Sequence, residues 1–312
     1  MRWLPADIDL NYGLMILFGI DLGGTKIEGV AIDSDRPEQA LCRPRVPSGA
    51  DRGYAHVVGQ IEKLVAEMES ASGHRRPERI GFGTPGTTDP ASGLVKNSNS
   101  TCLNGRPLRA DLSRRLGVDA RLANDANCFA LAEAVFGAAC GRAVVHGLIL
   151  GTGVGSGIIV HGQVLEGRHG ISGEWGHNPV CGETTPCYCG RKGCVETVIA
   201  GPSLERHYRE LTGVTLRLPE IVARAAVDEP AAVATIDRLV AKFGEAIAAV
   251  INVLDPDAIV IGGGVGNLEV LYTERTRSAI LRHLFNPELR TEILRPKLGD
   301  SAGVFGAALL AR

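Results

Sequence analysis

Hydrophobic residues near the start of the chain form two short runs on either side of a glycine turn. The run Ile16–Ile20, the turn Gly23–Lys26 and the returning run Ile27–Ile32 together predict strand, turn, strand. A second segment, His146–Val160, has the same plan, with glycines between two apolar runs. Two such units in one chain predict a duplicated architecture with a cleft between the halves.

Other segments of the chain have apolar residues at helical spacing. Tyr54–Ser70 carries apolar residues every three or four positions, which predicts an amphipathic helix. A polar loop is expected at Leu94–Leu103, and Gly262–Gly264 is expected to open another loop. Further helices are expected at Leu108–Leu116, Cys128–Phe136, Leu204–Tyr208, Pro219–Ala226, Ala231–Leu254, Thr273–Leu284 and Gly303–Ala311, and strands at Arg79–Gly83, Ala120–Leu122 and Ala258–Ile261.

Composition and charge narrow the class of protein. The chain has 312 residues, which is enough for two domains, and its 45% hydrophobic and 22% charged content is that of a globular protein. The net charge of −2 argues against a nucleic-acid or anionic-membrane partner. No apolar run reaches the ~18–20 residues that a membrane span needs.

Residues 1–14 lack the positive, apolar and cleavage regions of a signal peptide, and a second methionine, Met15, follows them. We expect these residues to be a disordered extension or the result of an upstream start. The chain has eight cysteines. Without a secretory signal they indicate a reducing compartment, the cytoplasm.

Three of the cysteines lie within the short segment Cys187–Cys194. His177, Cys187, Cys189 and Cys194 offer one imidazole and three thiolates, which satisfy tetrahedral zinc. Such a closed site would be structural and would hold a loop that lacks a core of its own. The alternative is a set of free thiols, and Cys181 is a further thiol nearby.

Asn124-Asp125 stands directly before a predicted helix. Asn and Asp fill N-cap positions routinely, so a structural role is one interpretation. The functional interpretation is that Asp125 accepts a hydroxyl proton as that oxygen attacks phosphorus. Glu174 and Glu196, each beside a residue of the zinc loop, are candidates to accept hydrogen bonds from sugar hydroxyls. Their alternative role is in surface salt bridges.

The glycine turns are candidates for phosphate binding. Gly23-Gly24 lets backbone amides approach a phosphate, Thr25 adds a hydroxyl and Lys26 a positive charge. Asp21 could hold Mg²⁺ through water. Alone, this stretch favours an ordinary β-hairpin with a Gly-Gly turn, and it matches neither the P-loop nor the dinucleotide pattern. Three such turns, each after an apolar strand, suit a nucleotide held between two lobes.

In combination, these motifs resemble the ROK family of sugar kinases and repressors. The resemblance covers nearly all of Ile16–Arg312. Because the sequence has no helix-turn-helix pattern before Ile16, we expect a kinase rather than a repressor. The matching motifs are DLGGTK (Asp21–Lys26), NDAN (Asn124–Asn127), GTGVGSG (Gly151–Gly157), GEWGH (Gly173–His177), CYCGRKGCVE (Cys187–Glu196) and IGGGV (Ile261–Val265).

The resemblance implies an α/β protein with the actin-like ATPase (ribonuclease H-like) fold: two lobes, with ATP and sugar in a central cleft. The small lobe is expected at 15–122, joined by the C-terminal helix 301–312, and the large lobe at 123–300, with the zinc loop at 177–194. Mg²⁺ and a structural Zn²⁺ accompany ATP, and a homodimer is expected.

The resemblance also assigns roles to residues. Asp125 is the general base, and His177 ligates zinc through one ring nitrogen and binds sugar through the other. The sugar-binding residues are Gly86, Asn99, Asn124, Asp125, Glu174, His177 and Glu196. The nucleotide-binding residues are Asp21, Gly23, Gly24, Thr25, Lys26, Gly151, Thr152, Gly153, Gly155 and Gly157, with adenine near Gly262, Gly263 and Gly264.

The expected reaction is ATP-dependent phosphorylation of the primary hydroxyl of a hexose. Val95–Leu108 and the GEWGHNP run look most like the fructokinase/mannokinase branch, so fructose is the expected substrate, with mannose beside it. The N-acetylglucosamine kinase branch is the alternative, since it shares runs of the LANDANCFAL and LILGTGVG type, and glucokinase comes third. The alternative from a different functional class is a protein that senses sugar without catalysing a reaction.

Overall fold

The computed structural model describes residues 15–36 and 39–312. The expected extension at 1–14 lies outside this range. The chain divides into two compact units. One runs to Asp125 and takes in Val304–Arg312, and the other is Ala126–Gly303. Asp125 therefore stands at the last position of the first unit, where the chain passes into the second.

The first unit is built on a mixed sheet in the order β3-β2-β1-β5-β8, with β4 also paired to β2. The predicted opening hairpin is confirmed, since β1 and β2 pair antiparallel from Ile16 opposite Asp33 to Leu22 opposite Ile27. β5 and β8 then add in parallel. The strands are β1 (Ile16–Leu22), β2 (Lys26–Asp33), β3 (Ala40–Cys42), β4 (Arg45–Pro47), β5 (Arg79–Thr84) and β8 (Asp119–Asn124).

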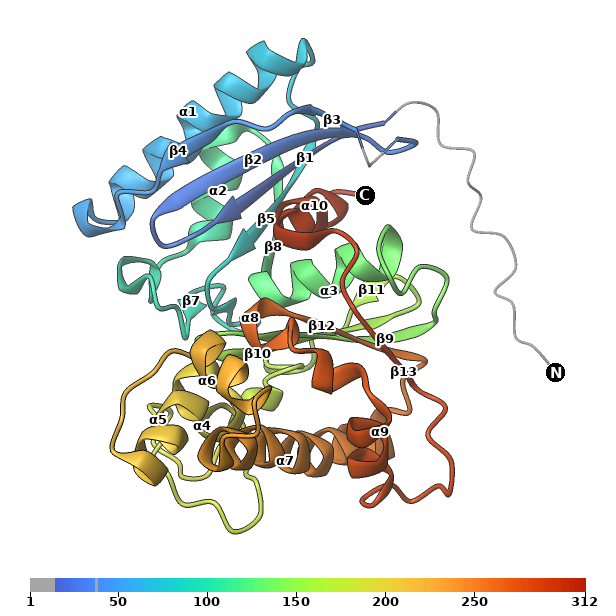
Figure 1. Ribbon diagram of the computed structural model, residues 1–312. Coiled ribbons are helices and arrows are strands. Elements are labelled where there is room, and N and C mark those ends of the chain that lie inside the picture. The colour runs from blue at the N-terminus through green and yellow to red at the C-terminus, as the bar shows by residue number, and fades with distance from the viewer. Residues whose placement is uncertain (1–14, 37–38) are drawn as a thin grey trace, which may run out of the picture. The chain divides into compact units, whose positions relative to one another are not determined.

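Helices cover both faces of this sheet (Figure 1). On one face, α1 (Tyr54–Ser72) and α2 (Leu108–Leu116) bury their apolar sides against Phe18 and Ile20. On the other face lies α10 (Ala302–Leu309), whose backbone packs directly on Gly19 and Gly81. A Cβ on Gly81 would lie 1.7 Å from the carbonyl oxygen of Ala307, so only glycine fits there.

The segment between β5 and α2 is more regular than the polar loop expected at Leu94–Leu103. Two short strands, β6 (Thr87–Thr88) and β7 (Val95–Lys96), pair antiparallel, and a 3-10 helix covers Thr101–Leu103. Leu103 is buried in the core of the first unit. Leu103 therefore anchors this end of the segment to that core.

The second unit repeats the topology of the first. Its sheet has the order β11-β10-β9-β12-β13, with β9 and β10 antiparallel and β12 and β13 added in parallel. This matches the predicted duplication. The strands are β9 (Val144–Leu150), β10 (Val154–Val160), β11 (Gln163–Val164), β12 (Ala258–Gly262) and β13 (Glu292–Leu294).

One face of this sheet packs on α7 (Pro230–Leu254), with Leu148 and Ile261 of the sheet and Phe243 of the helix in one core. The other face packs on α3 (Asp125–Val135), where glycines of the sheet allow close approach. The remaining helices are α4 (Glu196–Ile199), α5 (Gly201–Thr212), α6 (Leu218–Ala225), α8 (Gly263–Gly266) and α9 (Glu274–Leu281).

A buried carboxylate ties α3 to a distant segment of the second unit. Glu133 has no exposed surface, and its two oxygens accept hydrogen bonds from the backbone N–H groups of Ala138, Lys297 and Leu298 at 2.8–3.1 Å. These bonds satisfy a charge that would otherwise be expensive to bury. They fix the chain shortly before it returns to the first unit at Val304.

Among the residues that the structure describes, no helix is both long and apolar enough to cross a membrane.

Candidate functional site

Three parallel strands of the first unit end at one edge of the sheet and bring polar residues together there. Asp21 of β1 lies opposite Gly83 of β5, and Thr84 of β5 lies opposite Asn124 of β8. Asp125 follows directly and opens α3. The carboxyl ends of parallel strands are the usual ligand-binding edge of an α/β sheet. Here they gather the candidate metal-holding, sugar-binding and catalytic residues of this unit.

The two carboxylates at this edge lie close enough to interact. Burial, followed by the charges of Asp125 and Glu28, raises the pKa of Asp21 to about 6, and Lys26 opposes the shift. A divalent cation would remove this penalty because it favours the ionised carboxylate. The edge therefore has the electrostatic character of a site that accepts Mg²⁺.

The hairpin turn between β1 and β2 has a fixed shape and an open outer side. The hydroxyl of Ser48 donates a 2.6 Å hydrogen bond to the carbonyl oxygen of Gly24, and the Ser48 N–H donates to the carbonyl oxygen of Thr25. Within the described chain, a Cβ built on Gly24 would meet nothing within 4 Å. The turn can therefore receive a ligand against its backbone, as the phosphate-binding hypothesis requires.

In the second unit, two glycine turns lie side by side at the ends of β9 and β12. Gly262 of β12 pairs with Ile149 of β9, and a Cβ on Gly263 would lie 2.4 Å from the carbonyl oxygen of Leu150. Gly263 also has a φ of 84°, which favours glycine. Gly151 and the candidate adenine-site glycines therefore share one edge of the sheet.

Some predicted nucleotide-binding glycines have another structural role. Gly155 and Gly157 lie within β10, so the turn is confined to Gly151–Gly153. A Cβ on Gly157 would lie 2.7 Å from the Cα of Asn127, which shows that this glycine lets α3 pack on the sheet. The expected loop at Gly262–Gly264 is wrong, because β12 includes Gly262 and α8 begins at Gly263. The run of glycines hid the short helix from a pattern-based prediction.

The four predicted metal ligands converge. The ligand atoms of His177, Cys187, Cys189 and Cys194 all lie within 4.8 Å of one another. Two separations are 3.6 Å: Cys187 Sγ to His177 Nδ1, and Cys189 Sγ to Cys194 Sγ. Ligands at Zn–S and Zn–N distances of about 2.3 and 2.1 Å stand about 3.6–3.8 Å apart around a tetrahedron. The donor set and the spacing therefore fit zinc, and Cys181 is not among the four.

His177 has one ring nitrogen on each side of this group. Nδ1 faces the thiols, while Nε2 lies 3.0 Å from the hydroxyl of Tyr188. The two rings meet edge to face, with centroids 5.2 Å apart. Partial desolvation and the charges of Glu196 and Glu174 raise the pKa of Tyr188 to about 12. The two candidate sugar-binding carboxylates thus act electrostatically on the hydroxyl that contacts the outward-facing nitrogen of His177.

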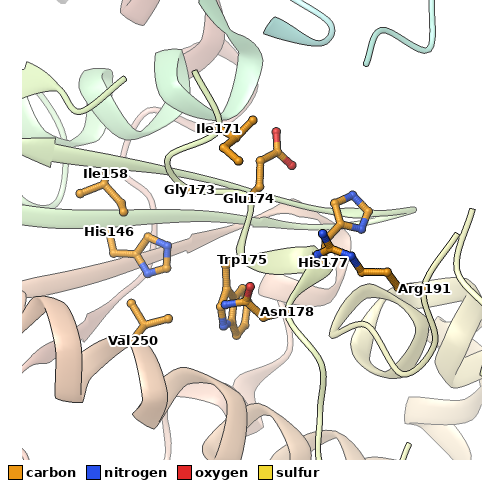
Figure 2. Close-up of a pocket in the computed structure, with 10 residues that line it drawn as sticks. All are labelled: His146, Ile158, Ile171, Gly173, Glu174, Trp175, His177, Asn178, Arg191 and Val250. Carbon is orange, nitrogen blue, oxygen red and sulfur yellow. The ribbon is translucent and has the colours of Figure 1, made fainter. Parts of the chain in front are cut away.

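Glu174 and His177 belong to a short rigid segment. A 3-10 helix covers Trp175–His177, and Trp175 anchors it by donating a 3.2 Å hydrogen bond from Nε1 to the carbonyl oxygen of Ala246 on α7. Both candidate residues line a cavity of about 300 Å³ in the second unit (Figure 2).

Two sugar-site candidates lie on the segment between β5 and α2. Gly86 has a φ of 77°, and a Cβ there would lie 2.5 Å from the carbonyl oxygen of Lys96, so it shapes the turn after β5. Asn99 is exposed on the same segment. Sequence reasoning missed Tyr188 and the buried His146. An aromatic residue between two metal-ligand cysteines is a signal for the first, whereas His146 in an apolar run resembles an ordinary core residue.

Comparison with known proteins agrees with this arrangement. The ROK family profile matches residues 17–312. An N-acetyl-D-glucosamine kinase of Yersinia pseudotuberculosis is 36% identical over 303 residues, covering 94% of this chain and 98% of that protein. A ROK hexokinase of Thermus thermophilus has a TM-score of 0.85 at 33% identity, covering 95% and 98% of the two chains.

A ROK family glucokinase of Streptomyces griseus, solved with glucose and AMPPNP, has a TM-score of 0.75 at 29% identity, covering 96% of this chain and 99% of that one. The fold is thus the actin-like ATPase fold. The chain belongs to the ROK family, and within it to the ATP-dependent sugar kinases.

Proposed function

We propose that this protein is an N-acetyl-D-glucosamine kinase, which transfers the γ-phosphoryl group of ATP to the primary hydroxyl at C6 of the sugar. The observation that carries the proposal is the 36% identity to a kinase named for this substrate, extending over 94% of the chain. The earlier expectation of fructose is not confirmed. This relative supports the alternative substrate instead.

In the proposed reaction, Asp125 takes the proton of the C6 hydroxyl as its oxygen attacks phosphorus. Asp21 contributes to holding Mg²⁺, which neutralises the charge of the phosphates. The turns at Gly23–Thr25 and Gly151–Gly153 present backbone N–H groups to them. Asn124, Glu174, His177 and Glu196 bind sugar hydroxyls.

Zinc has an indirect role in this proposal. When bound by the three thiolates and His177 Nδ1, it fixes the tautomer and direction of the imidazole. Nε2–H then points outward as a hydrogen-bond donor for a sugar hydroxyl. The contact of Tyr188 with this nitrogen supports the idea that it is accessible to a hydroxyl group.

A coupled assay of ADP release tests the proposal across N-acetylglucosamine, glucose, fructose and mannose with the purified protein. We expect kcat/KM to be highest for N-acetylglucosamine. A tenfold preference for fructose would reinstate the first expectation, and a preference for glucose would favour the activity of the Streptomyces relative.

A further inference from the structure

The cavity beside Glu174 and His177 contains a histidine that neither the metal group nor the proposed reaction uses. His146 lies on β9 and is 1% exposed. Neither of its ring nitrogens has a hydrogen-bond partner among the residues that the structure describes. Its ring meets Trp175 edge to face, with centroids 6.2 Å apart, an apolar contact that satisfies neither nitrogen.

Burial keeps this imidazole neutral, because it lowers the pKa of His146 to about 4. A neutral imidazole has one N–H donor and one acceptor nitrogen. Leaving both unpaired in the interior costs free energy, and buried polar side chains in native proteins are nearly always hydrogen-bonded. A neutral polar group that can accept or donate a hydrogen bond would therefore stabilise this ring.

The cavity provides space for such a group beside His146, which forms part of its wall with both ring nitrogens just beneath the surface. It has a volume of about 300 Å³, and since one water takes up about 30 Å³ of liquid, a substituent of several heavy atoms fits. Ile158, Val250 and Trp175 give it apolar walls. Figure 2 shows His146 and Ile158 at one end and His177 with Arg191 at the other.

We propose that this cavity is the subsite for the N-acyl substituent at C2 of the sugar, with His146 as the residue that hydrogen-bonds the amide. This inference rests on the proposed function, since it concerns the same sugar. An amide has one acceptor and one donor, either of which can pair with one nitrogen of the neutral imidazole, and its alkyl end suits the apolar walls. The volume leaves room for acyl chains longer than acetyl.

The unmodified protein provides the first test, through a series of glucosamines with N-acetyl, N-propionyl and N-butyryl groups, with glucose for comparison. We expect kcat/KM for the longer chains to stay within tenfold of the N-acetyl sugar. Ile158 lies opposite His146 in the β9–β10 pairing, on the same face. Ile158→Phe should fill the cavity, lowering kcat/KM for the N-butyryl sugar at least tenfold while glucose stays within twofold.

His146→Leu tests the hydrogen bond itself. Loss of a neutral hydrogen bond should lower kcat/KM for N-acetylglucosamine about fivefold and leave glucose within twofold. The same variant should raise the Tm of the ligand-free protein, because an apolar side chain replaces an unsatisfied one. His161→Asn, at an exposed histidine on the adjacent turn, is the matched control and should change neither sugar.

The outcomes separate this subsite from the proposed function. If N-acetylglucosamine is the best substrate but the longer chains are rejected and His146→Leu affects both sugars equally, the subsite is wrong and the function stands. If glucose or fructose is preferred, the function fails and the subsite with it. If His146→Leu does not fold, the N-acyl series and the Ile158→Phe variant still test the proposed subsite.

Discussion

Glu196, which opens α4 two residues after the last candidate metal ligand, contacts Val154 beside the glycine turn of the second unit: the Glu196 carboxylate accepts a 2.9 Å hydrogen bond from the Val154 backbone N–H. A Cβ on Gly153 would lie 2.7 Å from the same carboxylate. One side chain that is a candidate for binding sugar thus also shapes a turn that is a candidate for binding phosphate.

Substitutions of Glu196 should separate these two roles. Glu196→Gln keeps an oxygen acceptor for Val154 but loses the charge, so we expect KM for the sugar to rise about tenfold and KM for ATP to stay near normal. Glu196→Ala loses both, and both KM values should rise. Steady-state kinetics with each substrate varied in turn checks this, and identical effects of the two variants would contradict it.

Asp125→Asn should lower kcat about a thousandfold or more, because the amide cannot accept the proton of the attacking hydroxyl. Sugar binding should persist, since an amide still forms hydrogen bonds. Calorimetry measures the binding and the coupled assay the turnover, with the exposed Asp51→Asn as control. Near-normal turnover of Asp125→Asn would remove this residue from the role of base.

Metal analysis of the freshly purified protein should find one zinc per chain. Chelation, or the substitution Cys194→Ser, should remove it and lower the Tm, because the loop at 177–194 depends on the metal for order. Cys140 is exposed and lies outside the metal-binding group, so Cys140→Ser is the control and should keep full zinc content. Protein that is fully stable and active without zinc would refute this assignment.

The raised pKa of Asp21 predicts a pH-dependent stability difference. The pKa of about 6 exceeds the ordinary value of 3.8, so the metal-free fold favours the protonated carboxyl. Its stability contribution is present at low pH and is lost as the pH rises through 6. Asp21→Asn lacks this titration.

The Tm of Asp21→Asn minus that of the unmodified protein should therefore grow between about pH 4 and pH 6 in the presence of EDTA and level off above that. Mg²⁺ should reverse the trend in the unmodified protein only. A difference that does not change with pH would show that Asp21 ionises at its ordinary value.

Glu133→Ala should destabilise the protein by about 3 kcal/mol or more, because it leaves the backbone N–H groups of Lys297 and Leu298 without their acceptor in the interior. Urea unfolding measures the change. Glu210, whose side chain is 61% exposed, provides the control, and Glu210→Ala should stay within about 0.5 kcal/mol. A similar small effect at Glu133 would mean that water replaces the carboxylate.

Most of the fold could be predicted from periodicity, since β1, α1 and α7 have clear apolar patterns and lie where the sequence places them. The metal group could be predicted because four soft ligands in one loop have few other uses. Periodicity failed at Gly263, where glycines conceal a helix. It also could not reveal His146, because the cavity beside it is lined by segments distant in sequence.

The position of α10 has a consequence for synthesis on the ribosome. Gly19 and Gly81 pack directly against the backbone of this helix. In the order of translation, however, the entire second unit comes after these two glycines and before the helix. Until α10 has been synthesised, one face of the first sheet therefore lacks its helix, while Ala126–Gly303 is still emerging from the ribosome. A nascent chain stalled before Ala302 should expose that face to chaperones, even though every strand of the sheet has already been made.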